Sequence, residues 1–213
     1  MKKNIYRLVS TDDSRPSLMG VFHDGENKVA VAANYRLMLV SKPDYNEQLV
    51  NAERHSYDKD GREIKTQNYP HYTGVFSEGR RLNANRKEAV VGNLNAKAVE
   101  AALNAAKELG QRAKDLSGDK KHAITKGAYV RVGDDWFDAE LLSQLLPYFG
   151  DGAEVIMPEG ATWRGAYLKN NDYEAIVMPC QHREVEEGIV AHAYAISEGS
   201  GVDIDQYIPE SAL

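Results

Sequence analysis

The sequence predicts an α+β domain in which two helices pack on one face of an antiparallel sheet. Two segments, 95–109 and 138–146, carry apolar residues at helical spacing. Short runs rich in β-branched and aromatic residues, bounded by turn signals, fill much of the remainder. Between residues 129 and 180 the predicted order is strand, helix and three strands. That order suits one helix packed against an antiparallel meander.

The N-terminal part of the chain is predicted to consist of strands joined by tight turns. Segments 5–9 and 18–22 have strand composition, and the turn at 23–27 contains Asp24-Gly25, a typical hairpin signal. The apolar run 28–40 then forms either one strand or two strands with a bend at Asn34-Tyr35. We therefore expect adjacent antiparallel strands here.

Residues 44–79 are polar and rich in tyrosine, with a predicted turn at 58–61 between two short strands. The acidic turn residues Asp58 and Asp60 suggest a calcium loop at first sight. The calcium pattern requires acids where Ser56 and Gln67 stand. A hairpin turn is therefore the preferred interpretation.

Both predicted helices carry recognisable boundary residues. Asn95 is a suitable N-cap for the first helix, and Gly110 is expected to stop it. Asp138 is expected to cap the second helix, which Pro147 and Gly150 should end. The apolar stripe of the first helix consists of Val99, Ala102, Leu103 and Ala106. A charged connector is predicted for residues 111–126.

Three further strands, at 154–157, 162–168 and 173–178, complete the predicted sheet. Residues 1–181 would then form one domain. Residues 182–213 differ in composition, because seven acidic residues stand there against the single basic residue Arg183. This segment is expected to be an acidic C-terminal extension, either an extra element packed on the domain or a partly disordered extension. Its charge also suggests the hypothesis that it folds over a basic surface and competes with DNA.

Composition favours an ordinary globular protein of the cytoplasm. The 213 residues are 42% hydrophobic and 27% charged. The single cysteine, Cys180, excludes an internal disulfide and fits a reducing compartment. No apolar segment follows the basic N-terminus, so no signal peptide is expected. No pattern indicates a cofactor or a metal site.

Charge is distributed unevenly along a chain whose formal net charge is −6. Residues 79–131 contain twelve basic residues against five acidic ones. Such a segment could present a positive face to nucleic-acid phosphates, although a solvated lysine-rich surface accounts for it equally well. The candidate DNA-binding residues are Lys97, Lys107, Arg112, Lys114, Lys120 and Lys121.

Four fragments, taken in order, resemble a known family. Residues 15–22 read Arg-Pro-Ser-Leu-Met-Gly-Val-Phe, and residues 34–37 read Asn-Tyr-Arg-Leu. Residues 69–72 read Tyr-Pro-His-Tyr, and residues 173–180 end in Ile-Val-Met-Pro-Cys. Together they resemble the bacterial sliding clamp, the DNA polymerase III beta subunit. The chain departs from the clamp pattern in having Asn and Tyr where clamps have Gly and His before Arg-Leu.

The resemblance implies a single-domain, DNA-clamp-like fold with a replication- or repair-related binding role. In clamps these fragments converge on an apolar pocket that receives a short peptide of a partner protein. By that resemblance the expected partners are nucleic acid, a peptide of a replication or repair protein, and further copies of the chain. The implied pocket residues are Tyr35, Arg36, Leu37, Pro70, Val75, Ile176, Met178 and Pro179. An extended peptide could add backbone hydrogen bonds at a strand edge.

Two alternatives remain open on the sequence. The carboxylates Asp134, Asp135 and Asp138 could serve a small hydrolase or metal-dependent enzyme. A helix cap at Asp138 is the simpler interpretation. The scattered histidines are expected at the surface. A regulatory or structural protein with a clamp fold and no DNA contact is the other alternative.

Overall fold

A computed structural model describes residues 3–65, 68–114, 128–133, 135–159, 165–180 and 191–192. It is built on a seven-stranded antiparallel sheet in the order β1-β2-β3-β11-β10-β9-β6. These strands are β1 Phe22–Asp24, β2 Val29–Ala33, β3 Leu37–Ser41, β6 Ala89–Asn93, β9 Glu154–Pro158, β10 Ala166–Lys169 and β11 Tyr173–Val177.

Two smaller sheets accompany the large one. The first is the hairpin of β4 Ser56–Tyr57 with β5 Glu63–Ile64. The second contains β7 Ala128–Val132, β8 Asp135–Asp138 and the short β12 Ala191–His192, which pairs in parallel with β7. Through β12, part of the expected C-terminal extension joins the domain.

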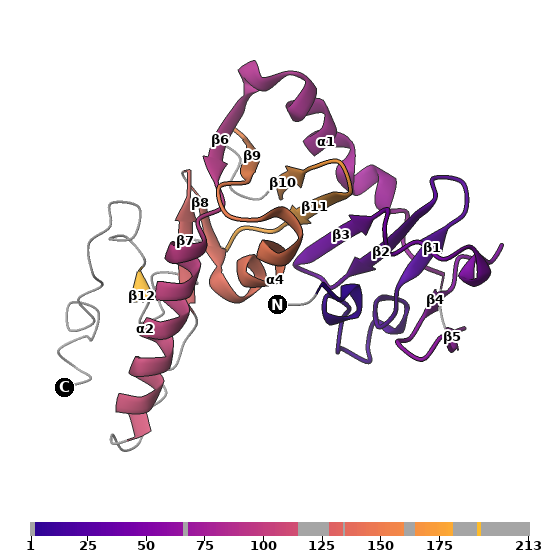
Figure 1. Cartoon of the computed structure of the whole chain (residues 1–213), viewed down its shortest axis with the longest axis horizontal. Helices are drawn as coiled ribbons and strands as arrows, with labels where there is room; N and C mark the ends of the chain where they lie inside the picture. Colours follow the sequence, from indigo (N-terminus) through magenta and orange to yellow (C-terminus); the bar gives the residue numbers. More distant parts are fainter. Residues whose placement is uncertain are drawn as a thin grey trace.

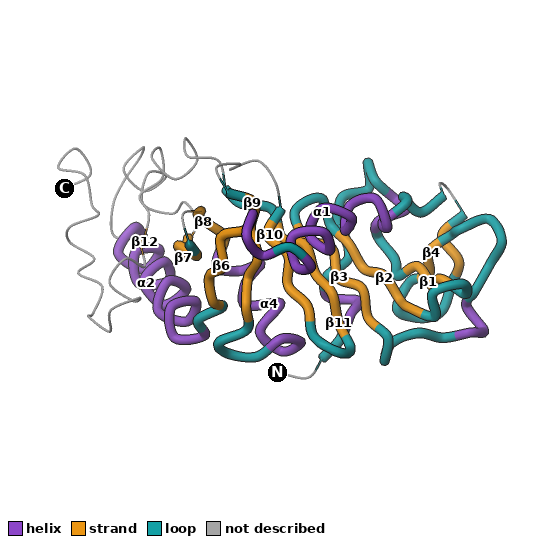
Figure 2. Tube along the Cα trace, turned by 90° about the horizontal axis from the view of Figure 1, so that it is seen from above, coloured by secondary structure: helices purple, strands orange, loops and turns teal. Residues whose placement is uncertain are grey.

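The α-helices of the described residues, α1, α2 and α4, lie on both sides of the large sheet (Figure 1). α2 Ala96–Lys114 and α4 Ala139–Phe149 contact one another and share one hydrophobic cluster with one face of the sheet. α1 Tyr72–Ala84 covers the other face with a second cluster. Figure 2 shows α2, β7, β8 and β12 gathered at one end of the molecule. The predicted α+β class and the predicted pair of helices on one face are confirmed.

α1 was not predicted, because its sequence has weak helix propensity. It contains two glycines, a threonine and a valine, all poor helix formers. Its stability comes from packing: Tyr72, Phe76, Gly79 and Leu82 form one buried stripe against the sheet. Tyr72 also donates a hydrogen bond of 2.8 Å to Asp24 beside the β1–β2 turn.

Both predicted helices begin where expected, and Gly150 caps the end of α4 as predicted, but α2 continues past Gly110 and α4 continues past Pro147. Asn95 Oδ1 accepts from the Ala98 amide, and Asp138 Oδ1 accepts from the Glu140 amide, so both caps are confirmed. α2 runs through Gly110 to Lys114, because one glycine among good helix formers costs only about 1 kcal/mol. α4 contains Pro147 and ends at Gly150, which adopts a left-handed φ of 82°.

Several short segments differ from their predicted form. The segment predicted as a strand at 5–9 contains the 3-10 helix η1 Ile5–Arg7, and the one at 18–22 begins in the 3-10 helix η2 Pro16–Leu18. The first strand predicted between residues 129 and 180 is a hairpin, because Gly133 turns the chain with φ of +60°. Further 3-10 helices are η3 Glu47–Leu49 and η4 Arg86–Glu88. The bend expected at Asn34-Tyr35 is confirmed between β2 and β3.

The close approach of α1 to the sheet makes a first test. A Cβ added at Gly79 would lie 2.6 Å from Cγ of the buried Tyr167 ring, whereas one at Gly74 would meet open space. We expect Gly79→Ala to lower the free energy of unfolding by about 1–3 kcal/mol. The control, Gly74→Ala on the same helix, should raise it by about 0.5–1 kcal/mol. Urea unfolding measures both, and equal effects would contradict this packing.

A buried histidine on β1 gives a pH dependence. Burial lowers the pKa of His23 from 6.5 to about 4, although the negative charge of Asp44 acts in the opposite direction and raises it. His23 Nδ1 accepts from the Asn46 amide, so the neutral ring is the form that fits. As the pH falls, the unfolded chain binds a proton on His23 before the folded chain does. The contribution of the neutral His23 to the free energy of unfolding is therefore complete above pH 6.5 and is lost as the pH falls towards 4.

The expected loss is at most roughly 3 kcal/mol for this group. Urea unfolding near pH 7 and about pH 5 should show a clear drop for the native chain. The drop should be smaller for His23→Gln, which keeps a hydrogen-bond acceptor and cannot be protonated. An identical drop in both proteins would assign the acid sensitivity to other groups.

Candidate partner-binding surfaces

Apolar side chains form a row across the sheet on the face that α1 covers. Met38 on β3 pairs with Ile176 on β11, and Ile176 pairs with Tyr167 on β10. Met38 and Met178 are partly buried and pack against the same cluster as Ile176. A Cβ at Gly165 would contact both Ile176 and Met178, so these two side chains are neighbours. The end of β11 therefore carries a methionine-rich surface.

Helical geometry places Val75 of α1 towards this end of the sheet. Arg80 bonds Glu174 at the start of β11, at a distance of 2.8 Å. Val75 and Arg80 are five residues apart, which puts them on opposite flanks of a helix with 3.6 residues per turn. Val75 thus lies on the flank towards the end of β11, and it is 47% exposed. We call Met38, Val75, Ile176 and Met178 the α1-flank surface.

Three further predicted pocket residues are exposed or half-buried, and the contacts described for Tyr35 and Pro70 are with arginines outside the α1-flank surface. Tyr35 in the β2–β3 turn is 63% exposed, with the Arg15 guanidinium 5.9 Å from its ring. Pro70 is exposed just before α1, and its carbonyl accepts a hydrogen bond from Arg54. Pro179 follows Met178 and is half-buried. Met38 was missed at the sequence level, although strand alternation puts it on the face opposite its neighbour Leu37.

Two predicted pocket residues lie elsewhere. The Leu37 side chain is buried in the cluster with α2 and α4, on the opposite face of the sheet. The Arg36 guanidinium forms an ion pair of 3.2 Å with Asp138 and donates to the Cys180 sulfur at 3.1 Å. Because β3 and β11 both have neighbours on each side, a peptide on the α1-flank surface cannot extend the sheet there. Binding would use side-chain contacts.

The predicted basic surface is centred on α2. Lys97 and Lys107 are exposed on the polar side of the helix, together with Glu100 and Asn104. Neither lysine forms an ion pair with an acidic residue of the described chain. Arg112 and Lys114 continue the same helix, and Lys120 and Lys121 lie outside the described residues. The lysines of the described surface are therefore available to an external anion.

The arginines of α1 and η4 contrast with these lysines. Arg80 pairs with Glu174, Arg81 with Glu78 and Glu88, and Arg86 with Glu154. Each guanidinium is thus offset by a carboxylate of the same domain. Three of the twelve basic residues in 79–131 thus belong to internal pairs and not to an open positive surface.

A small polar cavity of about 190 Å³ lies on the Arg80 flank of α1. Lys42, Arg80 and Lys169 line it together with Asp172 and Glu174. Burial raises the pKa of the Glu174 carboxyl, but the hydrogen bonds from Arg80 and Lys169 outweigh it, and the net pKa is lowered. The charges in this cavity largely compensate one another.

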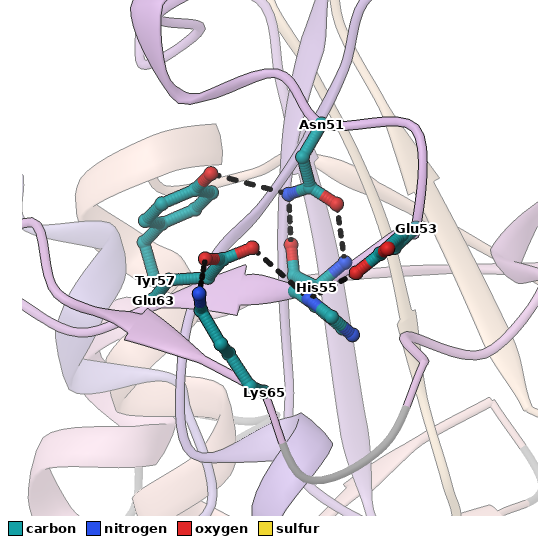
Figure 3. Close-up of polar contacts among 6 residues, drawn as sticks. All are labelled: Asn51, Glu53, His55, Tyr57, Glu63 and Lys65. Carbon is teal, nitrogen blue, oxygen red and sulfur yellow. Dashed lines mark hydrogen bonds and ion pairs between the residues drawn. The ribbon is translucent and has the colours of Figure 1, made fainter.

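The histidines expected at the surface are partly in the interior, which corrects that prediction. His23 and His55 are both buried, whereas His71 is exposed. His55 Nδ1 lies 3.0 Å from Glu63 and 3.6 Å from Glu53 (Figure 3). Asn51 bonds both backbone groups of His55. The polar residues around His55 stabilise the β4–β5 hairpin, so a structural role accounts for this polar cluster.

Among the carboxylates proposed for catalysis, the two that the structure describes have structural roles. Asp138 caps α4 and pairs with Arg36, and Asp135 belongs to β8. Asp134 lies outside the described residues. Within the described ranges, no group of three or more His, Cys, Asp or Glu side chains could hold a metal ion. No helix among the described residues is long and apolar enough to cross a membrane.

Comparison with solved structures finds bacterial sliding clamps. The C. crescentus beta sliding clamp matches with a TM-score of 0.49 and 13% identity over 83% of this chain. The DNA polymerase III beta chain of Streptococcus pneumoniae matches at 0.46 and 12%, and that of Borrelia burgdorferi at 0.40 and 15%, each over 83% of this chain.

The alignments cover 61%, 60% and 59% of those three chains. No protein-family model and no curated protein sequence matches the chain. The three solved structures are of the family that the sequence fragments resemble.

Proposed function

We propose that the chain is a non-catalytic, sliding-clamp-like module that binds an extended peptide of a partner protein on the α1-flank surface. The supporting observation is that Met38 on β3 and Ile176 and Met178 at the end of β11, far apart in the sequence, pack in one apolar cluster beside α1. Methionine side chains adapt to different apolar ligands at low cost, which suits recognition of short peptides. A replication- or repair-related role fits this activity.

A labelled peptide tests the proposal. The probe is a set of fluorescein-labelled pentapeptides with apolar residues alternating with polar ones, since an extended chain presents alternate side chains to one surface. We expect Val75→Lys and Met178→Lys each to weaken binding about tenfold, or roughly 1.4 kcal/mol, in fluorescence anisotropy.

Val91→Lys is the matched control, because Val91 is 42% exposed on β6 at the far edge of the same sheet. Its affinity for the peptides should equal that of the native chain. Equal losses in all three variants, or no binding by the native chain, would reject the α1-flank surface as the peptide site.

A second candidate activity, DNA binding through α2, is favoured by Lys97 and Lys107, which are exposed and form no ion pair among the described residues. An exposed lysine that is not held in an ion pair can replace a counterion on DNA at little cost. We propose that Lys97 and Lys107, with Arg112, Lys114, Lys120 and Lys121 continuing the same segment, contact DNA phosphates without base recognition.

The salt dependence of DNA affinity tests this activity. Lys97→Glu and Lys107→Glu should each lower the affinity and reduce the slope of log K against log salt by about 1. Lys59→Glu changes the net charge equally on the distant β4–β5 hairpin and should leave the slope unchanged. If all three variants lose affinity alike, the effect is net charge and α2 is not the DNA site.

A further inference from the structure

The polar cavity on the Arg80 flank of α1 lies where this helix meets one end of the large sheet. Residues of the β1–β2 turn, the end of β3, α1 and the β10–β11 turn line it. Thr73 and Arg80 contribute from α1, and they share one side of the helix because they are seven residues apart. Val75 lies on the other flank. This space, which we call the Arg80-flank cavity, is therefore separate from the α1-flank surface.

The strand register fixes one group of charges at the Arg80-flank cavity. Lys169 on β10 pairs directly with Glu174 on β11. The Glu174 side chain is 18% exposed, and each of its carboxylate oxygens contacts a different cation. Oε2 lies 2.8 Å from Arg80 Nε, and Oε1 lies 3.2 Å from the Lys169 ammonium. Two cations thus share one carboxylate, and the group keeps a net positive charge.

Two further charges line the same cavity without a charged partner among the described residues. The Lys42 ammonium donates to the Asn171 carbonyl at 2.7 Å, which engages one of its three N–H groups. The Asp172 carboxylate has neither a hydrogen bond nor an ion pair within the described chain. The backbones of these residues are neighbours, because the Lys42 amide donates to the Asp172 carbonyl at 3.0 Å. A cation and an anion therefore line one small cavity without pairing with each other.

The sheet and α1 also contribute apolar surface to the Arg80-flank cavity. Val29 on β2 and Val40 on β3 line it, and both side chains are buried. The Tyr72 hydroxyl is already bonded to Asp24, so this residue offers mainly its ring. The volume of about 190 Å³ is smaller than the sites of drug-sized ligands, which are roughly 300–1,000 Å³. A fitting ligand is thus small, with both charged and apolar groups.

We propose that the Arg80-flank cavity binds a free α-amino acid with an aliphatic side chain. The ligand carboxylate would accept hydrogen bonds from the Lys42 ammonium and from the Nη groups of Arg80, whose Nε is engaged within the chain. The ligand ammonium would donate to the Asp172 carboxylate. The aliphatic side chain would contact Val29 and Val40, where it displaces water from apolar surface.

A ligand that carries both charges fits this cavity better than a simple anion or a simple amine. A lone carboxylate or phosphate would bring a second negative charge close to Asp172, and a lone amine would meet the positive charges of Lys42 and Arg80. Both side chains that would bind the zwitterion, Lys42 and Asp172, are exposed. Ion pairs in contact with water contribute little each, so we expect a dissociation constant in the millimolar range.

Titration of the native chain with L-leucine, followed by amide chemical shifts in two-dimensional NMR spectra, tests the proposal. The shifts should saturate and should be confined to amides around the cavity, such as those of Lys42, Thr73 and Asp172. Isocaproate lacks the ammonium of leucine and isoamylamine lacks its carboxylate, so each should bind about tenfold more weakly. Isocaproate or inorganic phosphate binding as tightly as leucine would overturn the proposal. The absence of saturable shifts at the cavity up to about 50 mM leucine would do so as well.

Two substitutions separate the charges at the site. Asp172→Asn should lower the affinity for leucine to that for isocaproate, and Lys42→Met should lower it to that for isoamylamine, because each removes the partner of one ligand group. Asp60→Asn and Lys59→Met, at exposed positions of the β4–β5 turn, are the matched controls and should leave the affinity unchanged. Equal losses in the controls would assign the binding to net charge. Failure here leaves the proposed peptide and DNA binding unaffected, since neither uses this cavity.

Discussion

The antiparallel ladder between β3 and β11 is the constraint on which the remaining architecture depends. It pairs Leu37 with Val177 and Ser41 with Tyr173, so it joins the N-terminal hairpin to the last strands of the large sheet. These partners are far apart in the sequence, and closing such a loop has an entropic cost that only extensive burial can offset. Both faces of the ladder are indeed covered, one by α1 and the other by α2 and α4.

Burial on two faces also decides which residues are available for binding. Along β3, Leu37 and Leu39 enter the α2 and α4 cluster, while Met38 turns to the α1 face. Along β11 the same alternation separates Val177 from Ile176. A pocket inferred from consecutive residues therefore divides between two sides of one sheet. The residues that remain together are those separated by two positions or those contributed by different strands.

Local signals in the sequence were sufficient to predict helix caps and turns, where the side chain of one residue determines the backbone conformation around it. Asn95 and Asp138 cap their helices because their side chains accept nearby amides, and the turn at Asn34-Tyr35 forms for a similar reason. The α1 helix could not be predicted in this way, because Gly74 and Gly79 both disfavour a helix, and the packing of Gly79 on Tyr167 is a tertiary contact. The burial of His23 and His55 likewise depends on the packing of the 44–65 segment, which no local pattern reveals.

The placement of charge explains why sequence counts alone overstate the basic surface. The arginines of α1 and η4 form ion pairs with Glu78, Glu88, Glu154 and Glu174. Their charges are offset within the domain, so they contribute little to the electrostatic field outside it. The lysines of α2 lie on a helix whose buried side already packs on α4 and β7. Their charge has no described acidic partner, and an anion that meets them displaces only solvent and counterions. A stretch of mixed charge therefore separates into a part paired within the domain and an exposed part, and the proposed DNA contact concerns the second alone.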